Sequence, residues 1–422
     1  MAPLAESLRA AALVVARVAA GRSLRAELQR AAEAQSSQEQ AALTDLCFGT
    51  LRSYGRVQAI VRAIEHRPAS DRALEALLWC ALYALDCGRY AAYTVVNQAV
   101  LACVALRRER AKSYVNALLR AYLRRQHGIA AQLSADPIAR WQHPEWWIKR
   151  VRAAYPDRWQ EILARGNCRA PMCLRVNRRR GSAASYLERL AGEGVAARWL
   201  GQEALLLETP MASRRLPGYA DGDVSVQDAG AQRAPQLLDL HAGQRVLDAC
   251  SAPGGKCAHL LETADVALTA LELQGERADD VTRNLARLGL AAEVRTADCS
   301  VPEQWWDGRS YDRILADVPC TASGVARRHP DMKWLRRDGD VAACASRQAR
   351  ILEALWRVLA PNGKLLYVTC SVFPDENDAV VEGFLARAAN ARRLPLPDGR
   401  PPQLLPSAEH DGFYFALLEK SS

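Results

Sequence analysis

The chain has 422 residues, half of them hydrophobic, and a formal net charge of +9. This length exceeds what a single hydrophobic core usually serves, so two or three domains are expected. No apolar run is long enough to span a bilayer, and the N-terminal stretch is interrupted by Arg9 and Arg17. These features favour a cytoplasmic protein over a membrane or secreted one.

The positive charge is concentrated at the front of the chain. Residues 1–150 hold 21 Lys and Arg against 12 Asp and Glu, while the remainder is balanced. A polyanionic partner is one interpretation, and a solvated Arg-rich helix surface is the other. The twelve cysteines form no CxxC pair and are scattered through apolar segments. Buried thiols are therefore expected for most of them, with no zinc site and no disulfide framework.

Residues 1–127 show apolar residues at helical spacing only, which predicts a helical bundle. Ser36 and Glu39 form a capping-box sequence before a long periodic segment, residues 40–66. A linker is expected around residues 127–137. Residues 128–240 then alternate helical and strand-like stretches, including PMCLRVN, ALLLETP and VSVQD, and predict a smaller α+β region.

Residues 241–422 alternate strand-like and helix-like segments, which predicts an α/β domain with a parallel, doubly wound sheet. The expected strands are QRVLDAC, DVALTALEL, AEVRTAD, YDRILADVP and GKLLYVTC. Ligands of such sheets bind at the carboxyl ends of the strands. The residues that this rule places on one rim are Cys250, Glu272, Asp298, Asp317, Cys320 and Cys370.

Small residues and carboxylates at the strand ends indicate a nucleoside-bearing cofactor. In DACSAPGGK (248–256), two glycines allow close approach of a ligand, although the spacing is neither GxGxxG nor a P-loop. Glu272 could accept the hydroxyls of a ribose, and Asp298 the amino group of an adenine. Each carboxylate alone is as well explained by a helix cap or a surface charge. Three carboxylates at strand ends, Glu272, Asp298 and Asp317, together favour the cofactor.

Three motifs, DACSAPGGK, DVPCTASGVARRHPD and YVTCSVFPDEN, together resemble the RNA cytosine-5 methyltransferases that use S-adenosylmethionine. The similarity is greatest to bacterial members that act on small-subunit ribosomal RNA. Those proteins also carry a helical domain similar to the antitermination factor NusB, which WCALYALDCGRY and KSYVNALLR match less specifically. The resemblance implies a NusB-like all-α bundle (1–127), a connecting α+β RNA-binding region (128–240) and a Rossmann-like methyltransferase domain (241–422).

The resemblance also implies which residues contact S-adenosylmethionine, with no metal involved. They are Cys250, Ser251, Ala252, Pro253, Gly254, Gly255, Lys256, Glu272, Asp298 and Asp317. This chain departs mildly from the family pattern. Cys257 and Ala258 stand where Thr-Thr is usual, and Glu272 stands where Asp is more frequent.

Two cysteines at strand ends suit methylation of cytosine C5, because thiolate addition at C6 makes that carbon nucleophilic. The residues alone leave open whether Cys320 or Cys370 attacks, and a buried thiol or a Cys320–Cys370 disulfide are the structural alternatives. The resemblance implies that Cys370 is the nucleophile and that Cys320 assists elimination. Asp317 is expected to hydrogen-bond the base, and Lys256 to lower the pKa of the thiolate.

The expected substrate is 16S ribosomal RNA, at cytosine 967 by resemblance, with the target base splayed out of its stack. The alternatives are the same chemistry on transfer RNA, or an RNA-binding assembly factor without activity. Arg327, Arg328 and His329 either hold substrate phosphates or form a solvated loop. We expect a monomer without an obligate protein partner.

Overall fold

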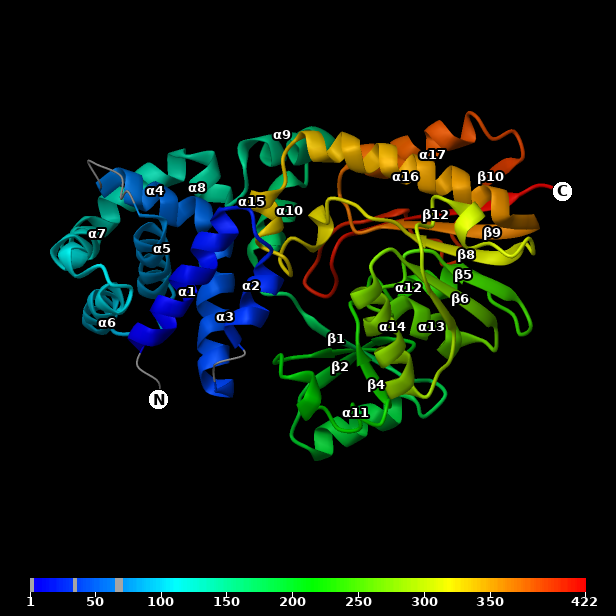
Figure 1. Ribbon diagram of the computed structural model, residues 1–422, viewed down its shortest axis with the longest axis horizontal. Helices are drawn as coiled ribbons and strands as arrows, with labels where there is room; N and C mark the ends of the chain where they lie inside the picture. Colours follow the sequence, from blue (N-terminus) through cyan, green and yellow to red (C-terminus); the bar gives the residue numbers. More distant parts are fainter. Residues whose placement is uncertain (1–3, 33–35, 65–70) are drawn as a thin grey trace. The chain divides into compact units, whose positions relative to one another are not determined.

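The computed structural model describes residues 4–32, 36–64 and 71–422, and the chain forms two compact units (Figure 1). The helical unit comprises residues 1–168 together with a distant segment, residues 326–337. The sheet unit comprises residues 169–325 and 338–422. Within the described ranges, no helix is both long and apolar enough to cross a membrane.

The helical unit is built around one buried apolar cluster to which most of its helices contribute. Its helices are α1 (Leu4–Ala19), α2 (Leu24–Ala32), α3 (Ser37–Arg52), α4 (Tyr54–Ile64), α5 (Arg72–Asp86), α6 (Ala92–Ala105), α7 (Lys112–Ala135), α8 (Pro137–Trp141), α9 (Glu145–Ala154), α10 (Trp159–Asn167) and α15 (Met332–Leu335). The predicted helical bundle is confirmed.

Local signals account for several helix ends. The predicted capping box is present, with the Ser36 side chain and Glu39 backbone paired at the start of α3. The periodic segment 40–66 is divided at Ser53 into α3 and α4, and its last two residues lie outside the described part. The expected linker is wrong, because α7 continues to Ala135. Residues 127–135 contain three Ala and no Pro, and the helix ends only where Asp136 caps α8.

The segment 326–337 packs into the helical unit although it follows the sequence DVPCTASG of the sheet unit. The Asp331 carboxylate accepts a hydrogen bond from Leu24 N at the start of α2, at 3.0 Å. The Lys333 side chain is fully buried, and its Nζ donates to Gln142 O at 2.9 Å and Asn167 Oδ1 at 2.8 Å. The segment is therefore part of the core of the helical unit.

We expect Lys333→Met to destabilise the protein by about 1–3 kcal/mol, because it leaves buried acceptors without a donor. Burial, and then the charge of Arg52, lowers the pKa of Lys333, so this ammonium is already held at a cost. Urea unfolding measures the change. Lys149→Met is the matched control, because that side chain is 73% exposed on α9 and its loss should change stability by less than about 0.5 kcal/mol. Equal effects of the two substitutions would contradict the prediction.

The sheet unit begins with a four-stranded antiparallel sheet of order β2-β3-β1-β4, covered by α11 (Ala183–Gly192). Its strands are β1 (Met172–Val176), β2 (Ala197–Gly201), β3 (Ala204–Leu207) and β4 (Val224–Val226). The sequence predicted β1, β3 and β4. It missed β2, because the residues just before ALLLETP were interpreted as the end of a helix. We call this part of the unit the small sheet.

The larger sheet has eight strands, in the order β10-β12-β9-β8-β5-β6-β7 with β11 paired to β12. The strands are β5 (Arg245–Asp248), β6 (Ala267–Glu272), β7 (Glu293–Thr296), β8 (Tyr311–Asp317), β9 (Leu359–Thr369), β10 (Ala391–Leu394), β11 (Gln403–Leu404) and β12 (Phe413–Lys420). The five predicted strands are β5 to β9, and they pair in parallel. The purely parallel prediction is wrong at one edge, where β12 pairs antiparallel with β9.

Helices cover both faces of the larger sheet (Figure 1). One face packs against α16 (Gly339–Val358) and α17 (Asp378–Leu385). The other packs against α12 (Arg233–Leu237), α13 (Gly255–Thr263) and α14 (Gly275–Leu288). The strand order reverses between β5 and β8, so the carboxyl ends of these two strands flank a crevice in which ligands of such folds bind.

Candidate active site

The carboxyl rim of the larger sheet encloses a cavity of about 270 Å³. Six strand-end residues that the sequence placed on one rim all line it, namely Cys250, Glu272, Asp298, Asp317, Cys320 and Cys370. Their convergence follows from the parallel pairing of β5 to β9, which brings the strand ends to the same edge. The prediction that these six residues lie on one rim is confirmed.

A partly buried ion pair joins two sides of this rim. Lys256 Nζ, in the first turn of α13, lies 2.6 Å from Asp317 Oδ2 at the end of β8. Burial opposes the charged form of Lys256, but the nearby Asp317 carboxylate outweighs it, followed by Cys370 and Asp248, and the pKa of Lys256 is raised. Lys256 therefore remains a cation close to the Cys370 sulfur.

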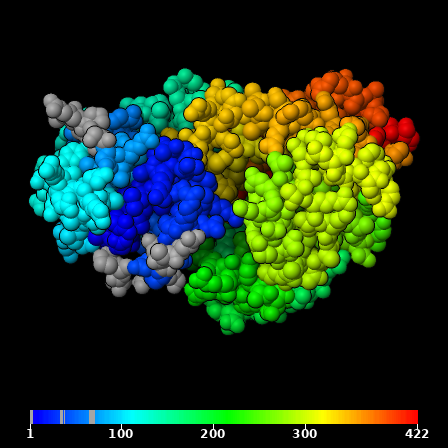
Figure 2. Space-filling view, viewed as in Figure 1, coloured from blue at the N-terminus to red at the C-terminus, as the bar shows by residue number. Residues whose placement is uncertain are grey.

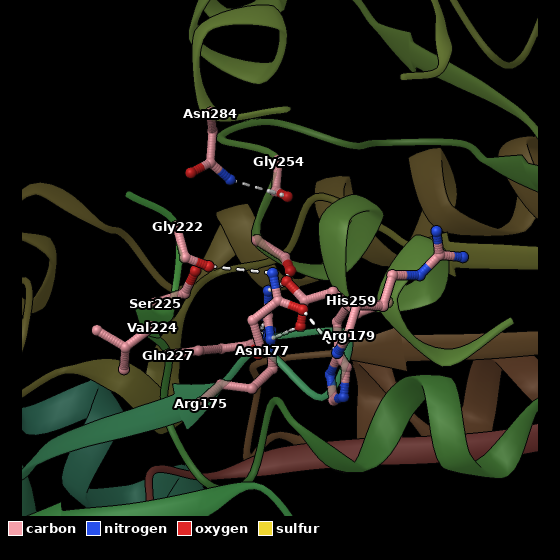
Figure 3. Close-up of polar contacts among 12 residues, drawn as sticks. Arg175, Asn177, Arg179, Gly222, Val224, Ser225, Gln227, Gly254, His259 and Asn284 are labelled. Atoms are coloured by element: carbon pink, nitrogen blue, oxygen red, sulfur yellow. Dashed lines mark hydrogen bonds and ion pairs between the residues drawn. The ribbon is translucent and has the colours of Figure 1, made fainter. Parts of the chain in front are cut away.

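The turn between β5 and α13 depends on its glycines. Gly254 has φ of +90° and lies against the backbone of Val281, so a side chain there would be both strained and crowded. Its carbonyl oxygen accepts a hydrogen bond from Asn284 Nδ2 on α14 at 3.3 Å (Figure 3). Ser251 donates to Leu271 O on β6 at 3.0 Å, so the turn is fixed from both ends.

The small sheet supports the same turn from below through Arg175, a buried residue of β1 (Figure 3). Its guanidinium donates to Gly255 O at 2.8 Å and to both carboxylate oxygens of Glu262 on α13, at 2.7 and 2.8 Å. Gln227 Oε1 accepts a further bond at 2.5 Å. Because Arg175 has no exposed surface, these contacts satisfy a charge that would otherwise be costly to bury. Sequence reasoning missed Arg175, whose strand position gave no signal of its partner.

The small sheet and α14 also meet directly, and the two form a continuous surface in the space-filling view (Figure 2). Arg287 on α14 donates to Val224 O and to Ser225 Oγ of β4, the latter at 3.0 Å. Asn177, after β1, donates to Gly222 O at 3.0 Å (Figure 3). The turn between β5 and α13 is thus supported by residues of the small sheet as well as by the larger sheet.

Cys320 and Cys370 face each other across the rim with their Sγ atoms 3.3 Å apart. This distance exceeds an S–S bond of about 2.05 Å, and both residues are free thiols. The hydrogen bond with Cys370, burial and nearby negative charges raise the pKa of Cys320 well above its usual value. These surroundings therefore disfavour a thiolate at Cys320.

The two acidic strand ends differ in their partners. Glu272 is 5% exposed, and its Oε1 accepts from Gln274 N at 3.2 Å and lies 3.4 Å from Arg277 Nη1. Asp298 Oδ1 accepts from the backbone and the hydroxyl of Ser300, at 2.9 and 2.7 Å. Burial acts against the Asp298 anion, yet the Ser300 contacts lower its pKa. Both carboxylates are held in place and reach the cavity.

Asp248, at the end of β5, is a further buried acid that the sequence did not single out. Its side chain has no exposed surface, and burial followed by repulsion from Asp317 raises its pKa to about 7. Arg327 also differs from expectation, because it is 2% exposed, while Arg328 is half-buried and His329 exposed. Arg327 is therefore poorly placed to meet phosphates in solvent.

The order of strands, the glycine turn and the acidic strand ends define a Rossmann-like methyltransferase fold of the type that depends on S-adenosylmethionine. Residues 235–419 match the family described as 16S rRNA methyltransferase RsmB/F. Residues 143–214 match the ferredoxin-like domain of the same proteins, and residues 6–124 match the NusB family.

Relatives match almost the full length of the chain. Ribosomal RNA small subunit methyltransferase B of Vibrio cholerae is 42% identical over 95% of this chain and 94% of its own. The protein of the same name from Pseudomonas syringae is 42% identical over 97% and 96%. The crystal structure of PH0851 shares the fold with a TM-score of 0.82 at 22% identity, covering 99% of both chains. The chain belongs to the RsmB/F methyltransferase family, which confirms the resemblance seen in its motifs.

We expect Glu272→Ala to weaken S-adenosylmethionine binding by about 2–4 kcal/mol, because it removes a charged acceptor from the cavity. Isothermal titration calorimetry measures the affinity, and thermal unfolding checks that the fold is retained. Glu276→Ala is the matched control, since that carboxylate is exposed in the first turn of α14. Unchanged affinity in Glu272→Ala would remove this residue from the cofactor site.

Proposed function

We propose that the protein methylates C5 of a cytosine in 16S ribosomal RNA through a covalent bond between Cys370 and C6 of the base. The observation that carries this proposal is the pair of free thiols, 3.3 Å apart, on a cavity that Asp317 also lines. The cation of Lys256 stands beside both Asp317 and Cys370. A nucleophile, a cation and an acid thus converge at one rim.

The cavity fits S-adenosylmethionine in the chemistry of its lining. Glu272 and Asp298 supply acceptors for ribose hydroxyls and an adenine amino group, and Asp317 supplies a carboxylate near the reacting centre. Residues 250–256 supply the turn at which backbone can approach the cofactor. When bound there, S-adenosylmethionine supplies a methyl group carried on a sulfonium.

The residues of the chain act on the cytosine. Cys370 attacks as thiolate, the S–C6 bond forms, and the electrons of the C5–C6 double bond move to make C5 nucleophilic. The Lys256 cation lies close to the sulfur on which negative charge is present before attack and after release. The Asp317 carboxylate accepts a hydrogen bond from the base and holds the ring over the sulfur. Once C5 carries the methyl group, a solvent water takes the remaining C5 proton, the C5–C6 double bond re-forms, and the S–C6 bond breaks so that Cys370 leaves as thiolate.

Cys320 serves the last of these steps. Its surroundings favour the protonated form, and a Cys320 thiol can donate a hydrogen bond to the Cys370 sulfur 3.3 Å away. A donor at that place stabilises the thiolate as it leaves C6. The raised pKa of Cys320 therefore supports the roles that the family resemblance implies, with Cys370 as nucleophile and Cys320 in release.

The choice of 16S ribosomal RNA is supported by the full-length relatives of Vibrio cholerae and Pseudomonas syringae, both of which are called ribosomal RNA small subunit methyltransferase B. The same chemistry on transfer RNA would use the same rim. A non-catalytic assembly factor is the less economical alternative, because it leaves the thiol pair, the Lys256 cation and the Asp317 carboxylate without a role. Bisulfite sequencing of RNA from a strain that lacks the protein tests both substrates together.

We expect the two cysteine variants to fail at different steps. Cys370→Ala should form neither covalent adduct nor methylated cytosine, since the attacking sulfur is gone. Cys320→Ala should still attack and methylate but release slowly, so that enzyme accumulates on RNA. A denaturing gel shows the adduct as a slow band that nuclease removes.

Cys344→Ala is the control, because it removes a thiol from α16 outside the cavity lining. Its gel should match that of the wild type. An adduct in Cys370→Ala and none in Cys320→Ala would reverse the two roles. If a 5-fluorocytosine RNA traps neither the wild type nor any variant, the covalent mechanism itself is wrong.

A groove between α6 and α7 of the helical unit is a candidate surface for the RNA. It has a volume of about 570 Å³ and is lined by Tyr93, Asn97, Lys112, Asn116 and Arg120, among others. The Tyr93 ring is 79% exposed, which is unusual for a large aromatic residue and suits stacking on an unpaired base. The two cations suit the phosphates beside it.

We expect the double variant Lys112→Ala with Arg120→Ala to weaken RNA binding and to reduce the slope of affinity against salt by about 1–2. Tyr93→Ala should weaken binding by about 1–3 kcal/mol with little change of slope, because stacking carries no charge. Fluorescence anisotropy with a 16S fragment measures both. Point variants are preferable to deleting residues 1–127, since the deletion would also expose the buried Lys333.

The double variant Lys149→Ala with Arg158→Ala is the control, because it removes two exposed cations of the same unit away from the groove. If it lowers the salt slope as much as the groove variant does, RNA responds only to the overall charge of the helical unit, and the groove is not a binding site.

A further inference from the structure

A buried carboxylate links the two loops that carry the cysteines. Glu376 ends the short 3-10 turn Pro374–Glu376, six residues after Cys370, and its side chain has no exposed surface. Burial raises its pKa, although hydrogen bonds to its carboxylate act in the opposite direction. An acid in this position is costly unless its oxygens are well satisfied, so its contacts show what it holds.

One set of contacts reaches the loop of Cys320. The backbone N of Thr321 donates to Glu376 Oε1 at 2.7 Å, and the Thr321 hydroxyl donates to Oε2 at 2.5 Å. Gln348 on α16 donates to Oε1 at 3.3 Å and to Pro319 O at 2.9 Å. Both neighbours of Cys320 in the chain, Pro319 and Thr321, are thus tied into one buried network.

The other set reaches the loop of Cys370. The Ser371 hydroxyl donates to Glu376 Oε2 at 2.6 Å. Because the Ser371 hydroxyl donates its proton to Glu376, it can only accept from the Ser323 hydroxyl, which lies 2.9 Å away. Ser323 itself accepts a hydrogen bond from Val372 N at 2.8 Å. The residues that follow the two cysteines, Thr321 and Ser371, therefore bind the same carboxylate oxygen.

Backbone contacts hold the loops at the same spacing. Gly324 N donates to Cys370 O at 2.8 Å, and a side chain at position 324 would collide with the backbone of Gly412 and Cys370. Ala322 has φ of +62°, a conformation that favours glycine and that persists only where the surroundings impose it. The loop of Cys320 is thus held in a specific and strained shape against the loop of Cys370.

We propose that Glu376 is a positioning residue whose carboxylate holds Cys320 against Cys370 so that the first thiol can assist release of the second. This inference rests on the proposed function, because it assigns Glu376 a part in the same thiol chemistry. Glu376 does not line the cavity and so does not touch the substrate. It acts through Thr321 and Ser371, the residues that directly follow Cys320 and Cys370 in the chain.

The negative charge of Glu376 also supports the proposed role of Cys320 as a hydrogen-bond donor. The carboxylate is among the groups that raise the pKa of Cys320, after the hydrogen bond with Cys370, burial and the charge of Cys370. A negative charge on that side of the pair disfavours a second thiolate beside the first. The charge of Glu376 thus favours the protonated form of Cys320, which is the form that the release step requires as a donor.

The test compares Glu376→Gln with Thr321→Val in the full chain, using steady-state methylation over many turnovers and the denaturing-gel adduct assay. Glutamine keeps the size of the side chain, but its amide nitrogen cannot accept the bonds that a carboxylate oxygen accepts. We expect Glu376→Gln to lower kcat about 10- to 100-fold with KM for RNA and S-adenosylmethionine changed less than about threefold, and adduct to accumulate as in Cys320→Ala. Thr321→Val should show a smaller change in the same direction.

Thr269→Val is the matched control, because Thr269 is a buried threonine of β6 whose hydroxyl contacts Glu293 and neither cysteine loop. Its kcat and adduct level should equal those of the wild type. If Glu376→Gln fails to fold by thermal unfolding, Thr321→Val carries the test. The double variant Glu376→Gln with Cys320→Ala should accumulate no more adduct than Cys320→Ala alone, because both changes remove the same donor.

Two kinds of failure are distinguishable. If the wild type traps no 5-fluorocytosine RNA, the covalent mechanism is wrong and this inference falls with it. If Cys320→Ala accumulates adduct but Glu376→Gln keeps the wild-type kcat and adduct level, only the inference about Glu376 is wrong. An additive loss in the double variant, or a rise in KM alone, would also overturn it, since either would mean that Glu376 acts elsewhere than on Cys320.

Discussion

The ion pair between Lys256 and Asp317 is the contact on which the rim depends. It joins the glycine turn after β5 to the end of β8, at the place where the strand order reverses. Removing either partner would leave the other charge uncompensated in a partly buried site, which costs more than the net value of the pair. The same contact that closes the crevice also fixes where its positive and negative charges lie.

Two further buried charges support the loops on either side of that pair. Arg175 lies beneath the glycine turn, and Glu376 lies behind the two cysteine loops. Each is satisfied mainly by atoms of the segments it supports, so a change in loop conformation would leave a charge unpaired. Such support favours a rigid site, in which the reacting groups need little reorganisation before chemistry.

The sequence predicted the five parallel strands and the six rim residues because strand-end position follows from chain order alone. It missed β12, since FYFALLEK is apolar on both faces and has no alternation to distinguish strand from helix. It missed Arg175 and Glu376 for another reason. Their partners lie in other segments, with Glu262 87 residues and Thr321 55 residues away, and no local pattern records such a pairing.

The interleaving of the two units constrains how the chain can fold as it is synthesised. Helices α1 to α10 leave the ribosome first, yet the residues that complete their core, among them Lys333 and Asp331, come more than 150 residues later. The helical unit cannot be complete when only α1 to α10 have emerged, because residues 326–337 are still missing. It differs in this respect from a domain formed by one continuous segment, which can fold as soon as it is made. Its final packing is possible only after residues 169–325 of the sheet unit have also been translated. Completion of the helical unit is therefore coupled to synthesis of most of the sheet unit.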